Sequence, residues 1–443
     1  MVHKLASQSG SSLTGKIRVP GDKSISHRAL MFGASAVGET RITGLLEAED
    51  VLRTSSALRS FGVSIKRAGE VWCVNGVGVG GFASPPDVID LGNSGTAARL
   101  LMGLLSTQNV TAHLTGDASL RSRPMERVIE PLSRMGANFN FMGSGRMPIV
   151  VHGSAEPIPI EYNMPVPSAQ VKSAILLAGL SAPGKTIVNE RSATRDHTEN
   201  MLRSFGANVV VDTLRGGGKR IELEGYPELV ATDVTVPGDP SSAAYPGVAA
   251  LLLPGSDVTI EHVGLNSLRT GLFKTLVDMG ADIEFQNKRD SAGELIGDIT
   301  FRYRPLRGTH VPADRAPSMI DEYPIAAIAG AFASGETRLC GLGELRVKES
   351  DRFSGIIDGL NACGVSARAD KDDIVIEGCG GPPTGSAEIA TKLDHRMAMS
   401  FLVMGMGTQS PVVIDNAAAI GTSFPGFLDL MTGLGGNFGL PDE

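Results

Sequence analysis

The sequence is poor in cysteine and aromatic residues, has no excess of positive charge, and lacks long hydrophobic runs. The four cysteines, which include no CxxC pair, predict reduced thiols with neither a zinc site nor a disulfide framework. The net charge of -8 argues against a nucleic-acid or membrane-surface partner, although a local cationic site could still bind anions. No run approaches the roughly 18 apolar residues of a membrane span, and residues 1–12 do not resemble a targeting peptide. We therefore expect a cytoplasmic protein without a membrane span.

Glycine, in contrast, is abundant, with 55 residues in a chain of 443. Many glycines indicate many tight turns, and hence many short elements rather than a few long helices. The content of 42% hydrophobic and 20% charged residues is that of a globular protein. The length predicts two or three domains.

One unit of helices and strands recurs along the sequence, about every 70 to 80 residues. Each copy starts with a polar or Pro-containing turn that leads into an apolar helix. The predicted helices are Ala29–Ala36, Thr96–Ser106, Ala169–Leu180, Ser242–Leu253, Tyr323–Ala333 and Arg396–Met406. A β-branched strand follows, at 39–42, 109–111, 186–188, 257–260, 336–339 and 411–414. A second, amphipathic helix then stops at a glycine, namely Gly62, Gly136, Gly206, Gly280, Gly364 or Gly435.

The turn Val19-Pro20-Gly21-Asp22 reappears as Val236-Pro237-Gly238-Asp239. Three repeats lie between the two turns and three follow the second. We therefore predict an α/β (α+β) protein of two domains with three repeats each. One domain spans residues 20–237, and the other spans residues 1–19 plus 238–443, with hinges at the two turns.

Two nucleotide-binding motifs occur by coincidence. The stretch 179–186 matches GxxxxGK[ST], but here a helix precedes the motif and a strand follows it, the reverse of a phosphate loop. The stretch 76–81 contains GxGxxG, but Pro85 and Pro86 soon after it prevent the helix that a dinucleotide site needs. We therefore predict no nucleotide site at either motif.

Polar clusters with Arg or Lys occur at the same end of most repeats, and only two of them add candidate acid–base carboxylates. The first cluster, Gly21–Arg28, places Lys23, Ser24 and Arg28 at the start of an apolar helix, where free backbone N–H groups favour a phosphate or carboxylate. Each cluster alone is typical of a solvated loop or surface ion pair. Together they indicate a site for polyanionic small substrates with one or two acid–base residues.

The motifs in these clusters resemble those of the 5-enolpyruvylshikimate-3-phosphate synthase family, and they occur in the family's order across essentially the whole chain. They read GDKSISHRA, LGNSGTAARLL, GDASLRSRPM, PSAQVKSAILLAGL, DEYPI, ELRVKESDR and LDHRMAMSF. Other stretches resemble the second sequence class of the bacterial enzymes. The resemblance implies a two-domain inside-out α/β barrel of six βαβαββ repeats with an interdomain active site. It also implies transfer of the enolpyruvyl group of phosphoenolpyruvate to the 5-hydroxyl of shikimate 3-phosphate, without cofactor or metal.

Matching motifs also imply residue roles. Shikimate 3-phosphate would be bound by Lys23, Ser24, Arg28, Ser168, Ala169, Gln170, Arg195, Asp321 and Lys348. Phosphoenolpyruvate would be bound by Lys23, Asn93, Gly95, Arg123, Gln170, Arg352 and Arg396. The catalytic residues would be Lys23, Asp321 as the base for the 5-hydroxyl, and Glu349 as the proton donor to the methylene carbon. Glu349 would need a raised pKa and Asp321 an ionised carboxylate.

Some positions depart from the family pattern. Thr422 stands where many members have a Lys, so one phosphoenolpyruvate contact is in doubt, and Leu100 stands where many first-class members have Pro. Gly95 stands where glyphosate-tolerant members of the second class have Ala. Because glycine lets a ligand approach the backbone closely, we expect glyphosate to inhibit. We also expect a monomer.

Three other functions fit the sequence less well. UDP-N-acetylglucosamine enolpyruvyl transferases have a proton-donating Cys where this chain has Asp117. RNA 3'-phosphate cyclases lack the paired VPGD turns and would favour a nucleotide site. A non-catalytic anion-binding repeat protein would have no need of both Asp321 and Glu349.

Overall fold

The computed structural model describes residues 4–141, 143, 145–291 and 293–441. The chain divides into two compact units. Unit 1 comprises Met1–Pro20, Pro237–Asp290 and Leu295–Glu443, and unit 2 comprises Gly21–Val236 and Ser291–Glu294. The short stretch 291–294 was not foreseen from the sequence. The assignment of domains to residues 20–237 and to residues 1–19 plus 238–443 remains a proposal.

The described strands form six four-stranded sheets that share one topology. In each sheet the first two strands are parallel, and the second and third are antiparallel. Six sheets of the same strand order are what six copies of one sequence repeat predict.

Unit 2 contains three of these sheets. The first is β14 (Val234–Thr235), β3 (Val37–Thr43), β5 (Val71–Val77) and β4 (Ser64–Ala68). The second is β6 (Ile89–Asp90), β7 (Thr111–Thr115), β9 (Ile149–His152) and β8 (Asn138–Phe141). The third is β10 (Glu161–Asn163), β11 (Lys185–Glu190), β13 (Lys219–Glu224) and β12 (Val209–Thr213).

Unit 1 contains the other three sheets. The fourth is β2 (Thr14–Ile17), β15 (Asp257–Gly264), β17 (Glu294–Arg302) and β16 (Asp282–Ser291). The fifth is β18 (His310–Val311), β19 (Ser334–Leu339), β21 (Asp373–Cys379) and β20 (Ser366–Asp370). The sixth is β22 (Ala387–Ile389), β23 (Val412–Ile414), β1 (Leu5–Gln8) and β24 (Asn437–Gly439).

Strands from the two ends of the chain lie next to each other in the sixth sheet. β1 pairs antiparallel with β23 on one side and with β24 on the other. β2 pairs in parallel with β15, so residues 5–17 are built into unit 1. The N-terminal residues thereby supply strands that the fourth and sixth repeats would otherwise lack.

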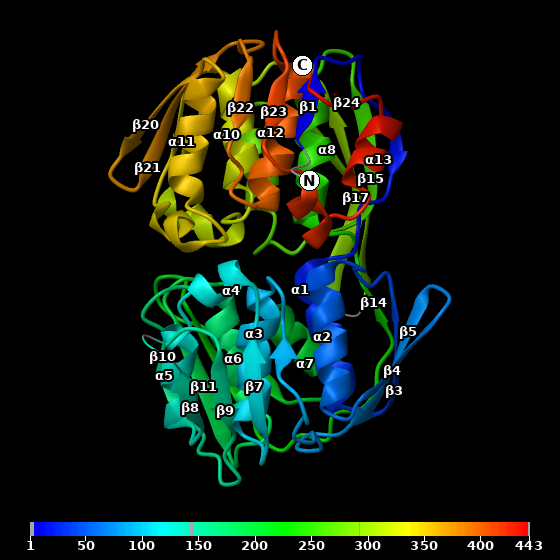
Figure 1. The fold of residues 1–443 in the computed structure, drawn as a ribbon, viewed down its shortest axis with the longest axis vertical. Helices are drawn as coiled ribbons and strands as arrows, with labels where there is room; N and C mark the ends of the chain where they lie inside the picture. Colours follow the sequence, from blue (N-terminus) through cyan, green and yellow to red (C-terminus); the bar gives the residue numbers. More distant parts are fainter. Residues whose placement is uncertain (1–3, 142, 144, 292, 442–443) are drawn as a thin grey trace. The chain divides into compact units, whose positions relative to one another are not determined.

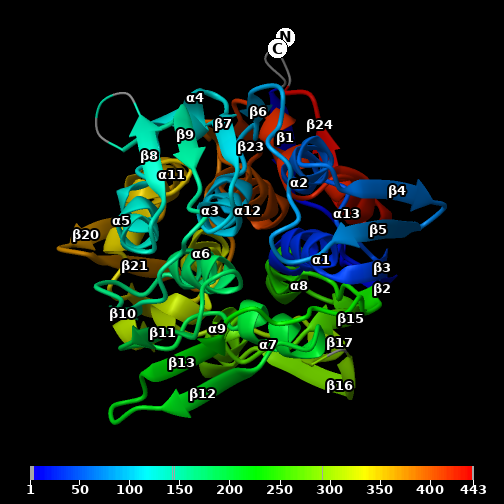
Figure 2. The same ribbon diagram turned by 90° about the horizontal axis from the view of Figure 1, so that it is seen from below.

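The apolar helices of the repeats lie inside their units, where most of their residues are buried (Figure 1). Every residue of α8, α10 and α12 is buried, as expected for helices that are apolar on all sides. Figure 2 shows β4–β5, β8–β9 and β12–β13 at the outside of unit 2, with α3 and α6 inside. The inner helices are α1 (Lys23–Ser35), α3 (Gly95–Ser106), α6 (Ala169–Gly179), α8 (Pro240–Leu252), α10 (Tyr323–Phe332) and α12 (His395–Gly407). The outer helices are α2 (Glu49–Ser60), α5 (Glu126–Arg134), α7 (His197–Ser204), α9 (Gly271–Asp278), α11 (Arg352–Ala362) and α13 (Phe427–Gly433).

Short helices complete the architecture: α4 (Ala118–Ser122) and the 3₁₀ turns η1 (Ala313–Ser318), η2 (Gly343–Val347) and η3 (Ala418–Thr422). Each unit has its own hydrophobic core. No helix of the described residues is long and apolar enough to cross a membrane.

The six glycines predicted to stop the outer helices all adopt positive φ, between 82° and 113°. This is the left-handed conformation that ends helices and that residues with a Cβ adopt at a cost. The order of elements predicted around both nucleotide motifs is also confirmed, because α6 ends at Gly179 before β11 starts and β5 is followed by β6 rather than by a helix.

Several predicted boundaries differ from the structure by one to six residues, and two of these differences have a local cause. The first inner helix starts at Lys23 rather than Ala29, because the Asp22 carboxylate accepts the backbone N–H of Ile25 at 2.9 Å and starts the helix earlier. The strand predicted at 109–111 begins only at Thr111, because Val110 donates its N–H to the Gln108 carbonyl in a tight turn, at 2.7 Å.

Gly103 allows α3 and α6 to approach each other closely. A Cβ at this position would lie 2.6 Å from the Cα of Ala174. Gly103→Ala gains about 1 kcal/mol of helix propensity, but overpacking against backbone costs about 1–3 kcal/mol. We therefore expect a lower free energy of unfolding in urea. Gly433→Ala, at an exposed position of α13 with nothing within 4 Å of the added methyl, serves as the control. Equal or greater stability of Gly103→Ala than of the wild type would contradict this account.

Candidate active site

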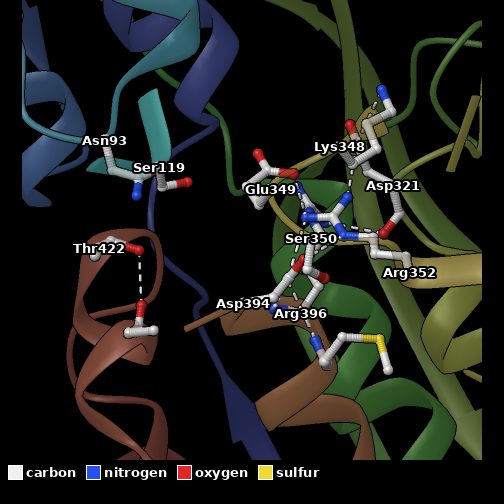
Figure 3. Close-up of polar contacts among 12 residues, drawn as sticks. Asn93, Ser119, Asp321, Lys348, Glu349, Ser350, Arg352, Asp394, Arg396 and Thr422 are labelled. Atoms are coloured by element: carbon white, nitrogen blue, oxygen red, sulfur yellow. Dashed lines mark hydrogen bonds and ion pairs between the residues drawn. The ribbon is translucent and has the colours of Figure 1, made fainter. Parts of the chain in front are cut away.

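The polar residues of unit 1 are organised around the buried guanidinium of Arg352, the first residue of α11. Its Nε donates to Asp394 Oδ2 at 2.8 Å and its Nη2 to Asp394 Oδ1 at 3.2 Å, which is a two-point pair. The same guanidinium reaches Glu349 Oε2 at 2.6 Å and Asp321 Oδ1 at 3.5 Å (Figure 3). One cation thus holds three carboxylates from three segments of the chain.

Helix starts explain this placement. The Asp351 carboxylate caps α11 by accepting the N–H of Ser354 at 3.1 Å. Asp394 caps α12 by accepting the N–H of Arg396 at 2.9 Å, and it also accepts the hydroxyl of Ser350 at 3.0 Å. Because Asp394 serves both as a cap and as the partner of Arg352, it joins the start of α12 to the start of α11.

The Arg352–Asp394 pair stays ionised. Burial alone lowers the pKa of Arg352, but the nearby carboxylates of Asp394 and Glu349 raise it above its usual range. Burial likewise raises the pKa of Asp394, and the attraction of Arg352 outweighs this and lowers it. A buried pair of opposite charges is therefore present at neutral pH.

Arg396, also buried, contacts the backbone of Asp321. Its Nη1 donates to the backbone carbonyl of Asp321 at 3.3 Å and lies 3.5 Å from Glu322 Oε1. Burial lowers the pKa of Arg396, but the charges of Asp321, Tyr245 and Glu322 raise it overall. Glu322 accepts in turn from the hydroxyl of Ser241 at the start of α8.

The remaining predicted residue of unit 1, Lys348, lies with its Nζ 4.0 Å from Asp321 Oδ1. The structure therefore brings together all five residues predicted in this unit: Asp321, Lys348, Glu349, Arg352 and Arg396. Asp321 and Glu349 are half-buried, whereas Arg352 is fully buried. The two candidate acid–base groups are thus accessible, and the cation that holds them is not.

Sequence reasoning missed the acidic and basic partners behind this group. Asp394 and Glu322 are nearly fully buried, and Arg269 donates to Asp239 Oδ1 and to the Ser241 hydroxyl, both at 2.9 Å. A signal existed for Asp239, which belongs to the repeated VPGD turn, and for Glu322 and Asp394, which stand inside quoted motifs. Arg269 stands in no motif.

In unit 2, the start of α1 carries Lys23, Ser24 and Arg28. Lys23 Nζ donates to Asp50 Oδ2 at 3.0 Å. Arg28 is buried, and its guanidinium donates to Thr198 Oγ1 at 2.7 Å, to the Ser24 carbonyl at 2.9 Å and to the hydroxyl of Ser173 at 2.7 Å. These bonds tie α1 to α6 and α7.

A second group in unit 2 surrounds the start of α3. The Arg123 guanidinium donates to Asn93 Oδ1 and to Ser119 Oγ, the latter at 3.1 Å. Asn93 also donates to Asp117 Oδ2 at 2.8 Å. A Cβ at Gly95 would lie 3.0 Å from Arg123 Nη1, so the missing side chain leaves room for this guanidinium.

The start of α6 carries Ser168, Ala169 and Gln170, all half-buried. Ser168 caps the helix, with its hydroxyl 3.4 Å from the backbone nitrogen of Val171. Gln170 Oε1 accepts from Arg99 Nη1 at 2.6 Å. Arg195 is half-buried and lies in the segment between β11 and α7. Sequence reasoning missed Arg99, which lies in α3, and the buried Lys172 of α6.

Thr422 ends η3, and its hydroxyl donates to the Ala419 carbonyl at 2.7 Å. Its hydroxyl therefore stabilises its own turn. Among the described residues, no group of three or more His, Cys, Asp or Glu side chains could hold a metal ion.

Comparisons with known proteins agree on one family. A model of the EPSP synthase (3-phosphoshikimate 1-carboxyvinyltransferase) family matches residues 7–431. The chain is 58% identical over 436 residues to the 3-phosphoshikimate 1-carboxyvinyltransferase of Paramagnetospirillum magneticum, covering 98% of both chains. It is 60% identical to the enzyme of the same name from Acidiphilium cryptum, covering 96% of this chain and 95% of the relative.

Solved structures lead to the same result. The structure of EPSP synthase from Acinetobacter baumannii matches with a TM-score of 0.87 and 44% identity, over 99% of this chain and 100% of that one. The similarity extends over both units, and the residues that carry the motifs cluster at helix starts. On the combined evidence of family match, identity and fold, the chain belongs to the EPSP synthase (3-phosphoshikimate 1-carboxyvinyltransferase) family.

Proposed function

We propose that the chain transfers the enolpyruvyl group of phosphoenolpyruvate to the 5-hydroxyl of shikimate 3-phosphate, releasing phosphate, in the shikimate pathway of aromatic amino-acid biosynthesis. The observation that carries this proposal is the placement of two accessible carboxylates, Asp321 and Glu349, against one buried guanidinium, Arg352. The reaction needs one group that accepts a proton and one that donates a proton, close to cations that bind anionic substrates.

Asp321 is the proposed base for the 5-hydroxyl, whose oxygen then forms a bond to C2 of phosphoenolpyruvate. Glu349 delivers a proton to the methylene carbon, which becomes a methyl group. The ionised Glu349 carboxylate then takes a proton back from this methyl group of the tetrahedral ketal phosphate as phosphate leaves, which restores the double bond. Lys23, held by Asp50 at 3.0 Å, is the third proposed catalytic residue.

The proposed substrate contacts follow the roles that the matching motifs imply. Arg352 and Arg396 of unit 1 and Arg123 of unit 2 supply guanidinium groups for phosphoenolpyruvate, together with Lys23, Asn93, Gly95 and Gln170. Guanidinium groups match the planar carboxylate and the phosphate of this substrate. For shikimate 3-phosphate the proposed contacts are Lys23, Ser24, Arg28, Ser168, Ala169, Gln170, Arg195, Asp321 and Lys348. The three hydrogen bonds of Arg28 within unit 2 support a role in which it orients Ser24 as well as contributing charge.

The alternative acceptor, UDP-N-acetylglucosamine, is not supported. Asp117, at the position of the thiol that such enzymes need, accepts the N–H of Leu120 at 2.7 Å and caps α4. The Asp117 carboxylate therefore stabilises the start of α4, and no thiol is present at this position to donate a proton. We also propose a cytoplasmic monomer that needs neither cofactor nor metal.

The direct test of this function is phosphate release. Mixing the protein with phosphoenolpyruvate and shikimate 3-phosphate should release phosphate in proportion to the enolpyruvyl product. Phosphate is measured by a coupled assay and the enolpyruvyl product by mass spectrometry. Replacing shikimate 3-phosphate with UDP-N-acetylglucosamine should give none. Release with the nucleotide sugar only would overturn the proposal.

Glu349→Gln tests the proton donor. The amide keeps the size of the side chain but cannot protonate the methylene carbon, so kcat should fall by roughly 10²-fold or more, the usual contribution of a positioned general acid. Affinity for shikimate 3-phosphate, measured by calorimetry, should change little. Glu336→Gln removes an exposed carboxylate from the same unit, where Glu336 pairs with Arg368 at 3.5 Å, and should leave kcat unchanged. Near-normal turnover of Glu349→Gln would remove this residue from the mechanism.

Gly95→Ala tests the length of the phosphoenolpyruvate site. The added methyl would lie 3.0 Å from Nη1 of both Arg123 and Arg99, so these guanidinium groups must shift by a few tenths of an ångström. The added methyl should weaken the binding of glyphosate, which is longer, more than the binding of phosphoenolpyruvate. We expect the inhibition constant of glyphosate to rise by more than about tenfold, or about 1.4 kcal/mol, with a smaller rise in the KM for phosphoenolpyruvate.

The matched control is Gly381→Ala, where nothing lies within 4 Å of the added methyl. This variant should change neither the inhibition constant of glyphosate nor the KM for phosphoenolpyruvate. Equal glyphosate inhibition of the wild type and Gly95→Ala would show that Gly95 does not set the length of the site.

A further inference from the structure

Lys172 is a lysine with no exposed surface in the interior of unit 2. It lies in the first turn of α6, two residues after Gln170. Its ammonium group lies 2.8 Å from Glu199 Oε1, 3.2 Å from Glu190 Oε1 and 3.1 Å from the carbonyl of Thr194. An ammonium has three N–H donors, so all of its donors have a partner.

The partners of Lys172 enclose the segment that carries Arg195. Glu190 ends β11 and Glu199 lies in the first turn of α7, and residues 191–196 connect the two elements. Glu190 also accepts the N–H of Thr194 at 3.2 Å and its hydroxyl at 2.7 Å. With the bond from Lys172 to the carbonyl, the N–H, hydroxyl and carbonyl of Thr194 are all bonded, and Arg195 is the next residue.

A second polar contact lies beside the first. Ser173 follows Lys172 on α6, Thr198 precedes Glu199 on α7, and their hydroxyl oxygens are 2.7 Å apart. Arg28 donates to both hydroxyls, at 2.7 Å each. The starts of α6 and α7 are thus joined at two successive positions, which fixes their relative rotation as well as their separation.

Stability alone does not account for this buried lysine. The desolvation of buried ions offsets much of their attraction, so a packed apolar side chain would serve the core as well or better. Burial lowers the pKa of Lys172, but Glu199 and Glu190 raise it overall, so the ammonium keeps its charge. What these bonds add over apolar packing is direction, since the ammonium fixes the carboxylates of Glu190 and Glu199 at the two ends of the connecting segment and the Thr194 carbonyl within it.

We propose that Lys172 is a positioning residue for the phosphate-bearing substrate. It holds the segment 191–196 against the start of α6, so that Arg195 and Ser168 present their donors to the same phosphate. This inference rests on the proposed function, in which both residues bind shikimate 3-phosphate. It predicts an effect on the KM for this substrate and little effect on the KM for phosphoenolpyruvate or on kcat.

Two variants test the inference. Lys172→Met removes the ammonium and keeps the length of the side chain, and should raise the KM for shikimate 3-phosphate by about tenfold or more. Because loss of one member of a buried ion pair can prevent folding, Thr194→Val provides a second variant. It removes only the hydroxyl bond to Glu190 and should raise the same KM by about three- to tenfold. In both, the KM for phosphoenolpyruvate and kcat should change less than about threefold.

Each variant has a matched control in unit 2. Lys185→Met breaks the exposed ion pair with Glu222, and Thr232→Val removes a hydroxyl that donates to the Ser204 carbonyl at 3.1 Å. Neither control variant should alter kcat or the KM for either substrate. In an Arg195→Ala background, Thr194→Val should have no further effect on the KM, since the hydroxyl acts through Arg195.

The outcomes separate the two proposals. If Arg195→Ala alone leaves the KM for shikimate 3-phosphate unchanged, the assignment of Arg195 under the proposed function is wrong, and the inference falls with it. If Arg195→Ala raises this KM and Thr194→Val does not, only the inference on Lys172 is overturned. Equal rises in the KM for both substrates would show that the network merely supports the fold, which also overturns the inference.

Discussion

The burial of the Arg352 guanidinium is the constraint on which the candidate site of unit 1 depends. A charged group without exposed surface must be surrounded by partners that replace its water, or the fold would be destabilised by several kcal/mol. Asp394 supplies the two-point partner, and it can do so only if α11 and α12 begin side by side. The same requirement draws in Glu349 and Asp321, so the solvation of one cation sets the positions of both proposed acid–base residues.

The clusters recur because the repeats recur. The inner helices α1, α3, α6, α8 and α12 each begin with a capping side chain that accepts a backbone N–H. A capping residue is polar and stands next to the free N–H groups and the positive end of the helix dipole. A fold that repeats this capped helix start in five of its six repeats therefore gathers caps, dipoles and nearby cations at corresponding places, and an enzyme for anionic substrates can be built from them.

The repeat pattern was predictable from the sequence because it depends on local chemistry. Gly62, Gly136 and the four equivalent glycines end helices through their own φ, and apolar runs such as Tyr323–Ala333 have no polar face to expose. The start of α1 was missed because the capping bond of Asp22 extends the helix across polar residues, which an apolar pattern cannot show. The individual site residues came from motif resemblance, and the structure brings those of unit 1 into one group.

The buried ion pairs could not be predicted in the same way, because each joins residues far apart in sequence. Lys172 contacts Glu190 and Glu199 only when α6, β11 and α7 are packed together. Arg352 contacts Asp394 only when α11 of the fifth repeat is packed against α12 of the sixth. A lone charge in an apolar helix, as in the stretch Val171-Lys172-Ser173, signals that such a partner must exist but does not identify it.

Both units show the same division between buried and accessible groups. In unit 1, Arg352 and Asp394 have no exposed surface, whereas Asp321, Lys348 and Glu349 beside them keep between 17% and 28% of their side chains exposed. In unit 2, Lys172 is fully buried, and the Arg195 segment that it holds is half-buried. A fully desolvated pair has few alternative geometries, because every other arrangement leaves a charge without a partner. The buried pairs can therefore hold the accessible groups in place without touching a substrate, and the accessible groups keep the solvent exposure that the proposed proton transfer and anion binding require.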